Sequence, residues 1–194
     1  MSRVTIRERR IQDIPRLVEI LAEQQPQSRY PFRWPLPFPT EQFIAREHEL
    51  AAFVAELDGE VVGHVCIQSV QGQAITHAHV DDSLDRAWSA GHGRPAADLA
   101  TVSSLFTALS ARGHGAGGTL LDAAVAWIRA HDLAPCLDVV QRHSVALKVY
   151  EARGWICVGE ARPPWLPDDE PPVLAMILLP DCRGASSSQT RTNA

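Results

Sequence analysis

The stretch "SARGHGAGGTLL", residues 110–121, combines a glycine-rich turn with the start of an apolar helix pattern. Its glycines follow a G-x-G-x-x-G spacing at Gly113, Gly115 and Gly118. The preceding run "LATVSSLFT", residues 99–107, is rich in β-branched and aromatic residues and predicts a strand. Apolar residues at helical spacing follow the glycines and predict a helix that ends near His131. A strand, a glycine turn and a helix form a phosphate-binding site, because free N–H groups and the helix dipole favour negative charge there.

This turn fits a dinucleotide-binding fold poorly. That fold expects an acidic residue about 20 positions further on, at the end of the next strand. Asp138 lies at about that distance, but Val139 and Val140 continue the strand beyond it. Hairpin-like segments precede the turn, and too few residues follow it for a second nucleotide-binding half. No Gly-Lys-Ser/Thr follows the glycines, which excludes a Walker-type nucleotide loop.

Length and composition indicate one globular domain. The chain has 194 residues, of which 45% are hydrophobic and 21% charged. We expect the domain over residues 1–180 and a short disordered polar tail over residues 181–194. The net charge of -5 argues against nucleic-acid binding, because phosphate affinity needs clustered Lys and Arg. An acidic protein is better suited to a cationic small molecule or peptide.

The cysteines and the hydropathy of the chain bear on its location. No C-x-x-C pair occurs, and three of the four cysteines lie in apolar runs, which favours a reducing cytosol. The N-terminus lacks the apolar region of a signal peptide, and the longest aliphatic run, residues 173–179, is too short to span a bilayer. We expect a cytoplasmic protein with no nucleic-acid or membrane partner, and we leave formation of a homodimer open.

Hydrophobic periodicity predicts the remaining regular elements. Asp58 and Gly59 join two apolar runs and predict a tight hairpin. Asp13 is a candidate cap for a helix that follows the first strand. Further strands are predicted at residues 4–8, 135–140, 155–161 and 171–179, and a further helix at residues 144–154.

The segment "YPFRWPLPFPTEQF", residues 30–43, alternates prolines with aromatic residues and predicts a loop. A helix is expected to follow it over residues 40–48. The loop is either an aromatic lid over an acceptor pocket or a stiff connection whose aromatic rings plug the edge of the core.

Residues 71–98 predict a long excursion that contains a short helix. Its position before the glycine-loop strand suggests that some of its residues border the acceptor site, namely Trp88, His92 and Arg94. His77, His79 and Asp81 occupy alternate positions, so on a strand they would share one face, as metal ligands could. No further candidate ligand follows them at a recognisable spacing. We therefore expect these three residues to face solvent, and we predict no metal site.

The array Arg112-Gly113-His114-Gly115-Ala116-Gly117 resembles the R/Q-x-x-G-x-G/A pyrophosphate loop of the GNAT superfamily of acyl-CoA-dependent N-acyltransferases. Further along, "ALKVYEARGW" is similar to that family's A-x-x-x-Y-x-x-x-G-F ending, with Ala146, Tyr150, Gly154 and Trp155 in register. The resemblance covers residues 4–179. It implies an α/β (α+β) fold with a mixed central sheet of about six to seven strands, splayed at a cofactor cleft and flanked by helices.

The resemblance also implies the binding of acetyl-CoA as co-substrate, between the strands at residues 99–107 and 135–140. Backbone groups of Leu105, Phe106 and Thr107 would pair with the pantetheine arm as an added strand does. The pyrophosphate would lie on the loop formed by Arg112, Gly113, His114, Gly115, Ala116, Gly117, Gly118 and Thr119. His143 stands where relatives often carry asparagine, and we expect a ring nitrogen of His143 to reach the cofactor.

Tyr150 matches the tyrosine that, in this family, acts as general acid toward the leaving thiolate. Some members of the family carry a basic residue on the strand before the pyrophosphate loop. The matching positions here are Thr101 and Ser103, and neither is basic. His64, on the second hairpin strand, is the candidate base, against the alternative that it is a structural histidine. The sequence thus predicts an N-acetyltransferase acting on a primary amine of a small, cationic molecule or of a protein. The alternatives are a non-catalytic acyl-CoA sensor and, third, a nicotinamide-dependent oxidoreductase.

Overall fold

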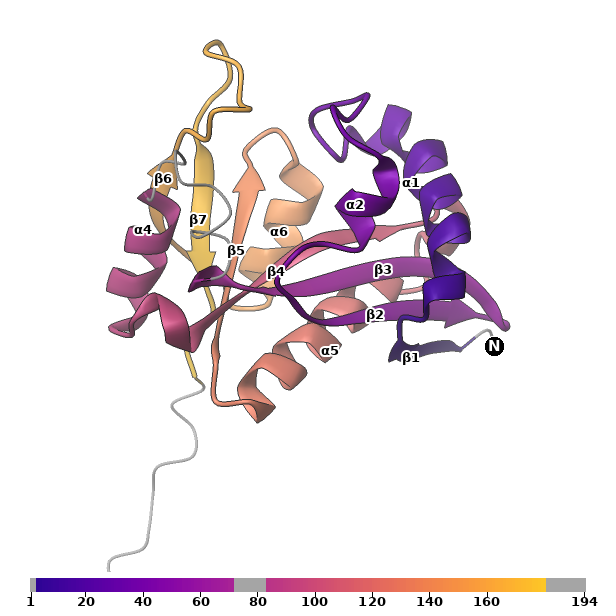
Figure 1. Ribbon diagram of the computed structural model, residues 1–194, viewed down its shortest axis with the longest axis horizontal. Coiled ribbons are helices and arrows are strands. Elements are labelled where there is room, and N and C mark those ends of the chain that lie inside the picture. The colour runs from indigo at the N-terminus through magenta and orange to yellow at the C-terminus, as the bar shows by residue number, and fades with distance from the viewer. Residues whose placement is uncertain (1–2, 72–82, 181–194) are drawn as a thin grey trace, which may run out of the picture.

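The computed structural model describes residues 3–71 and 83–180, and its strands form one sheet (Figure 1). Seven strands are arranged in the order β1-β2-β3-β4-β5-β7-β6. They are β1 (Val4–Glu8), β2 (Glu49–Leu57), β3 (Glu60–Ser69), β4 (Leu99–Thr107), β5 (Ala134–Val140), β6 (Ile156–Ala161) and β7 (Val173–Ile177). β4 and β5 are parallel, and the other neighbouring pairs are antiparallel. The predicted mixed α/β sheet is confirmed.

Helices cover both faces of this sheet. They are α1 (Ile14–Ser28), α2 (Thr40–Ile44), α4 (Ser83–His92), α5 (Ala116–Ala130) and α6 (Ser144–Ala152), with short 3-10 turns at Ile11–Asp13, Ala96–Asp98 and Leu109–Ala111. α1 packs on β3 and β4, and α5 packs on the other face of the same strands. α4 covers β6 and β7, while α6 lies beside β5 in the view of Figure 1.

The sheet splits between β4 and β5. These two strands pair only where Leu99–Thr101 lies beside Ala134–Cys136. Beyond Thr101, β4 continues along β3 and β5 continues along β7, so that the two strands diverge (Figure 1). Within residues 3–71 and 83–180, the facing edge of β4 over residues 102–107 therefore has no strand partner, as the predicted splayed sheet requires.

The Asp-Gly hairpin forms as predicted. Asp58 and Gly59 have φ angles of +52° and +87°, which are the two positive values that a two-residue hairpin turn needs. The helix predicted over residues 40–48 is shorter, because the backbone is already extended at Ala45 and leads from there into β2. The predicted tail at 181–194 and the residues His77, His79 and Asp81 lie outside the described residues.

Candidate active site

The glycine turn lies at the N-terminus of α5, directly after β4. Gly113 has a φ of +81°, and Gly115, the N-cap of α5, has a φ of +77°. A Cβ added at either residue would point into open space, so the left-handed backbone is what requires glycine here. Gly118 has a different constraint, because a Cβ there would collide with the guanidinium of Arg153, which pairs with Asp122 at 3.0 Å.

This turn presents backbone N–H groups without protein partners. The N–H of Thr119 donates to the Gly115 carbonyl at 3.0 Å, and the N–H of His114 donates to the Ala111 carbonyl at 3.2 Å. Within the described ranges, no acceptor bonds to the N–H groups of Gly113, Gly115, Ala116, Gly117 and Gly118. Unpaired N–H groups that converge at a helix N-terminus fit an anion such as the pyrophosphate of an acyl-CoA.

Side chains beside the turn are mostly engaged with the protein itself. The Arg112 guanidinium donates to Gln27 Oε1 at 3.0 Å, which ties the turn to the end of α1. The Thr119 hydroxyl donates to the Gly115 carbonyl at 3.1 Å. On β4, Phe106 is buried against His64, whereas Leu105 and Thr107 are partly exposed beside the unpaired strand edge. Unpaired backbone groups thus lie on that edge and again in the glycine turn, while the N–H groups of Ala108, Ala111, Arg112 and His114 between them are bonded within the protein.

His64 on β3 is enclosed completely, and both of its ring nitrogens are bonded. An arginine guanidinium can only donate, so Arg9 Nη1 at 3.2 Å makes Nε2 of His64 an acceptor. Nδ1 then carries the hydrogen and donates to the Ser104 carbonyl at 3.0 Å. Burial lowers the pKa of His64 to about 3. These contacts favour the structural alternative for His64 over the role of general base.

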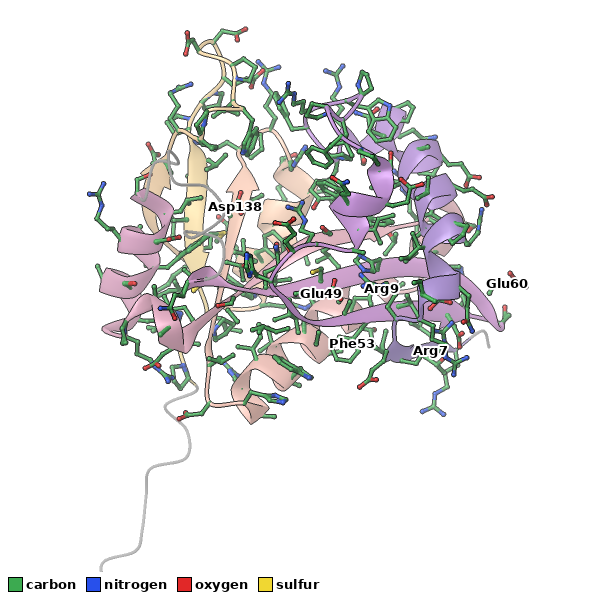
Figure 2. The ribbon with its side chains drawn as sticks, in the orientation of Figure 1. Arg7, Arg9, Glu49, Phe53, Glu60 and Asp138 are labelled. Atoms are coloured by element: carbon green, nitrogen blue, oxygen red, sulfur yellow. The ribbon has the colours of Figure 1, made fainter. Side chains whose placement is uncertain are left out.

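The residues that contact His64 surround an irregularity in the backbone of β4 at Ser104. Ser104 has a φ of +47°, and the pairing of β3 with β4 shifts its register at this point. The Ser104 hydroxyl donates to the Phe43 carbonyl at 2.6 Å and accepts from Arg46 Nε at 2.9 Å. Arg9 in turn forms a bidentate pair with Glu49, at 2.7 and 2.9 Å (Figure 2). This buried network was not visible in the sequence, because its members come from separate segments.

Tyr150 on α6 retains the features of a proton donor. Burial raises the pKa of its hydroxyl to about 12, and the nearby carboxylate of Asp138 adds to this effect. The phenol is therefore protonated at neutral pH. Among the described residues, none lies within hydrogen-bonding distance of the hydroxyl, so it is available to a ligand.

Asp138 is the site residue whose role the sequence did not reveal. It lies on β5, beyond the stretch that pairs with β4 (Figure 2). Its side chain is exposed where the sheet splits, but the protein atoms on its other sides partly desolvate the carboxyl and so raise its pKa, with Arg46 acting in the opposite direction. No ion pair to it forms within the described chain. An accessible carboxylate with a raised pKa, close to Tyr150, is a candidate proton acceptor.

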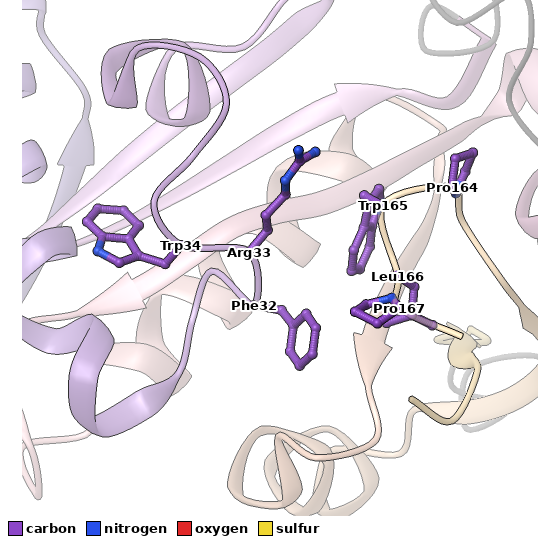
Figure 3. A pocket seen from close by; sticks show the side chains of 7 residues that line it. All are labelled: Phe32, Arg33, Trp34, Pro164, Trp165, Leu166 and Pro167. Atoms are coloured by element: carbon purple, nitrogen blue, oxygen red, sulfur yellow. The ribbon is translucent and has the colours of Figure 1, made fainter. Parts of the chain in front are cut away.

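The proline-rich loop faces the β6–β7 loop across a hollow of about 440 Å³ (Figure 3). Its lining consists of Phe32, Arg33, Trp34, Pro164, Trp165, Leu166 and Pro167. Tyr30, at the start of the loop, instead packs on the core and contacts the Phe43 ring at 5.7 Å. The loop thus borders a hollow and also plugs the edge of the core, and its role as a lid over an acceptor stays a prediction.

His143 joins this aromatic wall. Its Nε2 bonds to the Arg29 carbonyl at 3.0 Å, and its ring lies 5.8 Å from Tyr30 and 6.5 Å from Phe32. Burial lowers its pKa. The structure therefore places the imidazole against the proline-rich loop, and its contact with a cofactor stays a prediction.

The residues of the 71–98 excursion that are expected to border the acceptor do not line this hollow. Trp88 is 2% exposed, and its Nε1 donates to the Leu137 carbonyl at 3.1 Å. His92 bonds to the Pro135 carbonyl and Arg94 to the Asp132 carbonyl, at the end of β5 opposite to the hollow. These side chains fasten α4 to the sheet. In residues 3–71 and 83–180, no group of three His, Cys, Asp or Glu side chains is placed to hold a metal ion.

A split sheet with a glycine turn after the strand that opens it is the arrangement expected of an acyltransferase of this fold. Residues 14–155 match the model of the acetyltransferase (GNAT) family. The chain therefore belongs to the GNAT family and is an acetyltransferase, which confirms the predicted enzyme class. No curated protein matches the sequence. Within the described part of the chain, no helix is long and apolar enough to cross a membrane.

Solved structures share the whole fold at low identity. The ribosomal-protein-S18-alanine N-acetyltransferase of Escherichia coli is 17% identical, with a TM-score of 0.60 over 90% of this chain and 92% of that one. A histone acetyltransferase HPA2 and related acetyltransferase of Corynebacterium glutamicum is 25% identical, with a TM-score of 0.61 over 93% and 99%. An N-acetyltransferase of Staphylococcus aureus is 19% identical, with a TM-score of 0.64 over 91% and 97%.

Proposed function

We propose that this acetyltransferase transfers an acetyl group from acetyl-CoA to a primary amine by direct attack. The observation that carries the proposal is the pair of unpaired backbone stretches, one on the edge of β4 and one in the glycine turn at Gly113 and Gly115. Thioester chemistry is what acetyl-CoA would supply when bound there. The chain itself must bind the phosphates, orient the acceptor and handle two protons.

Asp138 is the residue that we assign to the first proton. An ammonium group must lose a proton before its nitrogen can attack a carbonyl, and a carboxyl with a raised pKa accepts that proton more readily than an ordinary one. Its accessible side chain and the absence of a competing ion pair in the described residues support this role. His64 is not assigned a catalytic role, because its ring nitrogens are both bonded.

Tyr150 is assigned to the second proton. As the new C–N bond forms and the C–S bond breaks, the hydroxyl of Tyr150 donates its proton to the departing sulfur, which leaves as a thiol. The raised pKa of Tyr150 keeps that proton in place until it is needed. The proton taken up by Asp138 then passes to solvent, the nitrogen of the adduct loses its second proton to solvent as the amide forms, and Tyr150 recovers its own proton from solvent. The overall reaction therefore releases one proton from an ammonium acceptor.

The first experiment is thermal unfolding with acetyl-CoA, beside NADH and ATP at matched concentration. A ligand at 100 times its Kd stabilises a protein by about 2.7 kcal/mol, which raises Tm by roughly 5–10 °C in a domain of this size. Stabilisation by acetyl-CoA together with amine-dependent thiol release supports the enzyme. Stabilisation without thiol release would indicate an acyl-CoA sensor, and stabilisation by NADH alone would contradict the cofactor assignment.

The role of Asp138 is tested with Asp138→Asn and a matched control, Asp98→Asn. Removing a general base costs roughly 100-fold or more in kcat/KM. We expect such a loss in Asp138→Asn, with unchanged stabilisation by acetyl-CoA. Asp98→Asn alters an exposed carboxylate that pairs with Arg94 at 3.6 Å, and it should keep full activity. Equal activity in the two variants would remove Asp138 from the mechanism.

The proposal also covers the cellular compartment of the enzyme, its acceptor and its oligomeric state. We assign it to the reducing cytoplasm, because Cys66, Cys136 and Cys157 are free thiols, and burial raises the pKa of Cys66 to about 12. We keep a small cationic amine as its acceptor, in line with the net charge of -5. Gel filtration with light scattering would decide whether it is a monomer or a homodimer.

A further inference from the structure

The hollow between the proline-rich loop and the β6–β7 loop has the lining of an aromatic-binding pocket. Its volume of about 440 Å³ lies in the range of small-molecule sites. Phe32 and Trp165 stand on opposite loops with ring centroids 6.5 Å apart, and prolines and Leu166 complete the wall (Figure 3). Trp165 is 39% exposed and Trp34 37%, so aromatic faces are open to a ligand at the entrance.

The β6–β7 side of the hollow is held in shape by Arg162. Its guanidinium donates to the Pro167 carbonyl at 3.0 Å and to the Glu170 carbonyl at 2.7 Å. Glu170 itself is buried and pairs with Arg142. The loop that presents Trp165 is therefore fixed by charge-assisted hydrogen bonds, which is the preformed arrangement that small-ligand sites usually show.

The hollow leads along β5 to Asp138. Val140 packs in one cluster with Leu166 and Phe32. Asp138 lies two residues before Val140 on the same strand, so both side chains project from the same face, roughly 7 Å apart. On the other side, the rings of Phe32, His143 and Tyr30 follow one another at 6.5 and 5.8 Å. An aromatic wall thus connects the hollow to the carboxylate.

We propose that the acceptor is an arylalkylamine, whose ring occupies the hollow of Phe32 and Trp165 and whose ammonium group faces Asp138. This inference rests on the proposed function and narrows its acceptor to one chemical class. A short alkyl chain between ring and nitrogen would extend from the hollow along β5 toward Asp138. Aromatic rings attract one another in offset or edge-to-face arrangements, and aromatic faces also attract the ammonium group.

The charges around the hollow disfavour an acceptor with several cationic groups. Its lining holds no carboxylate, and its charged member is Arg33, which has no ion pair in the described residues. Asp168 and Asp169 follow at the tip of the loop but do not line the hollow. A polyamine would bring further positive charges beside Arg33, and like charges at short range repel. A single ammonium group needs only Asp138.

The test compares 2-phenylethylamine and tryptamine with butylamine, spermidine and a peptide with a free N-terminus, by acetyl-CoA-dependent thiol release. We expect kcat/KM to be roughly tenfold higher for the aryl amines than for butylamine, the scale of a lost apolar contact in a pocket. Trp165→Ala and Phe32→Ala should lower kcat/KM roughly tenfold for the aryl amines and less than about twofold for butylamine. Phe38→Ala is the matched control, because Phe38 is 41% exposed on the same loop but does not line the hollow.

The outcomes separate this inference from the function on which it rests. Two results would overturn the aromatic acceptor alone. One is faster thiol release with spermidine or the peptide than with the aryl amines. The other is thiol release with the aryl amines that neither Trp165→Ala nor Phe32→Ala changes. No release with any amine, and no stabilisation by acetyl-CoA, overturns the proposed function itself. Retained stabilisation by acetyl-CoA in each variant shows that the variant is folded, and Trp165→Phe should restore most of the preference.

Discussion

Acidification should destabilise this protein through His64. The folded-state pKa of about 3 lies below the ordinary value of 6.5, chiefly because burial disfavours the charged ring. Between these values the unfolded chain binds a proton that the folded chain does not, so stability is complete above about pH 6.5 and falls as the pH is lowered toward 3. One pH unit in this window corresponds to about 1.4 kcal/mol. A shift from about pH 7.5 to about pH 5 should therefore remove about 2 kcal/mol.

The assay is urea unfolding of the wild type and of His64→Gln at both pH values. His92 and His143, whose pKa values burial also lowers, contribute equally to both proteins and cancel in the comparison. We expect the wild type to lose about 2 kcal/mol more than the variant. Equal losses would refute the buried, neutral histidine. If His64→Gln does not fold, the ring resonances of His64 in the wild type should still report a neutral imidazole at about pH 5.

Three further substitutions test the site. Gly115→Ala places a side chain at a φ of +77° and should cost about 1–2 kcal/mol, seen as a lower Tm with weakened acetyl-CoA binding, whereas Gly117→Ala, within the helix, should not destabilise. Ser104→Ala removes the buried bonds to Phe43 and Arg46 and should cost about 2 kcal/mol in urea unfolding, clearly more than Ser103→Ala on the same strand. Tyr150→Phe should lower kcat roughly tenfold or more at unchanged acetyl-CoA affinity, and an unchanged kcat at saturating substrates would remove Tyr150 from catalysis.

The elements that the sequence predicts well are those whose signals are local. β4 begins and ends where its β-branched run does, and the hairpin follows from Asp58 and Gly59 because a two-residue turn needs positive φ at both positions. The glycine turn could also be predicted, since its backbone needs positive φ angles that glycine adopts readily. α2 shows the limit of this reasoning, because the good helix formers Ala45, Arg46 and Glu47 follow Ile44 while the chain must already turn toward β2 at Ala45.

The polar network around His64 could not be predicted because its members are distant in sequence. Arg9, Glu49 and His64 come from the first connection, from the start of β2 and from β3, and each is an ordinary residue in its own segment. A histidine on a strand looks the same whether its nitrogens are free or bonded. The contacts that decide the question, with Arg9 Nη1 and the Ser104 carbonyl, exist only once β3 lies between β2 and β4.

Asp138 illustrates how topology gives one residue its chemistry. Within "PCLDVV" it interrupts an apolar run, which by itself indicates only a strand with one polar position. Had β4 paired with β5 along its full length, a carboxylate at this position would face the helices that cover the sheet. Because the pairing stops at Cys136, the same carboxylate is open to solvent beside Tyr150, two residues from the apolar cluster that supports the hollow. The split that leaves the β4 edge unpaired therefore also exposes the carboxylate that we propose as the acceptor of the amine's proton.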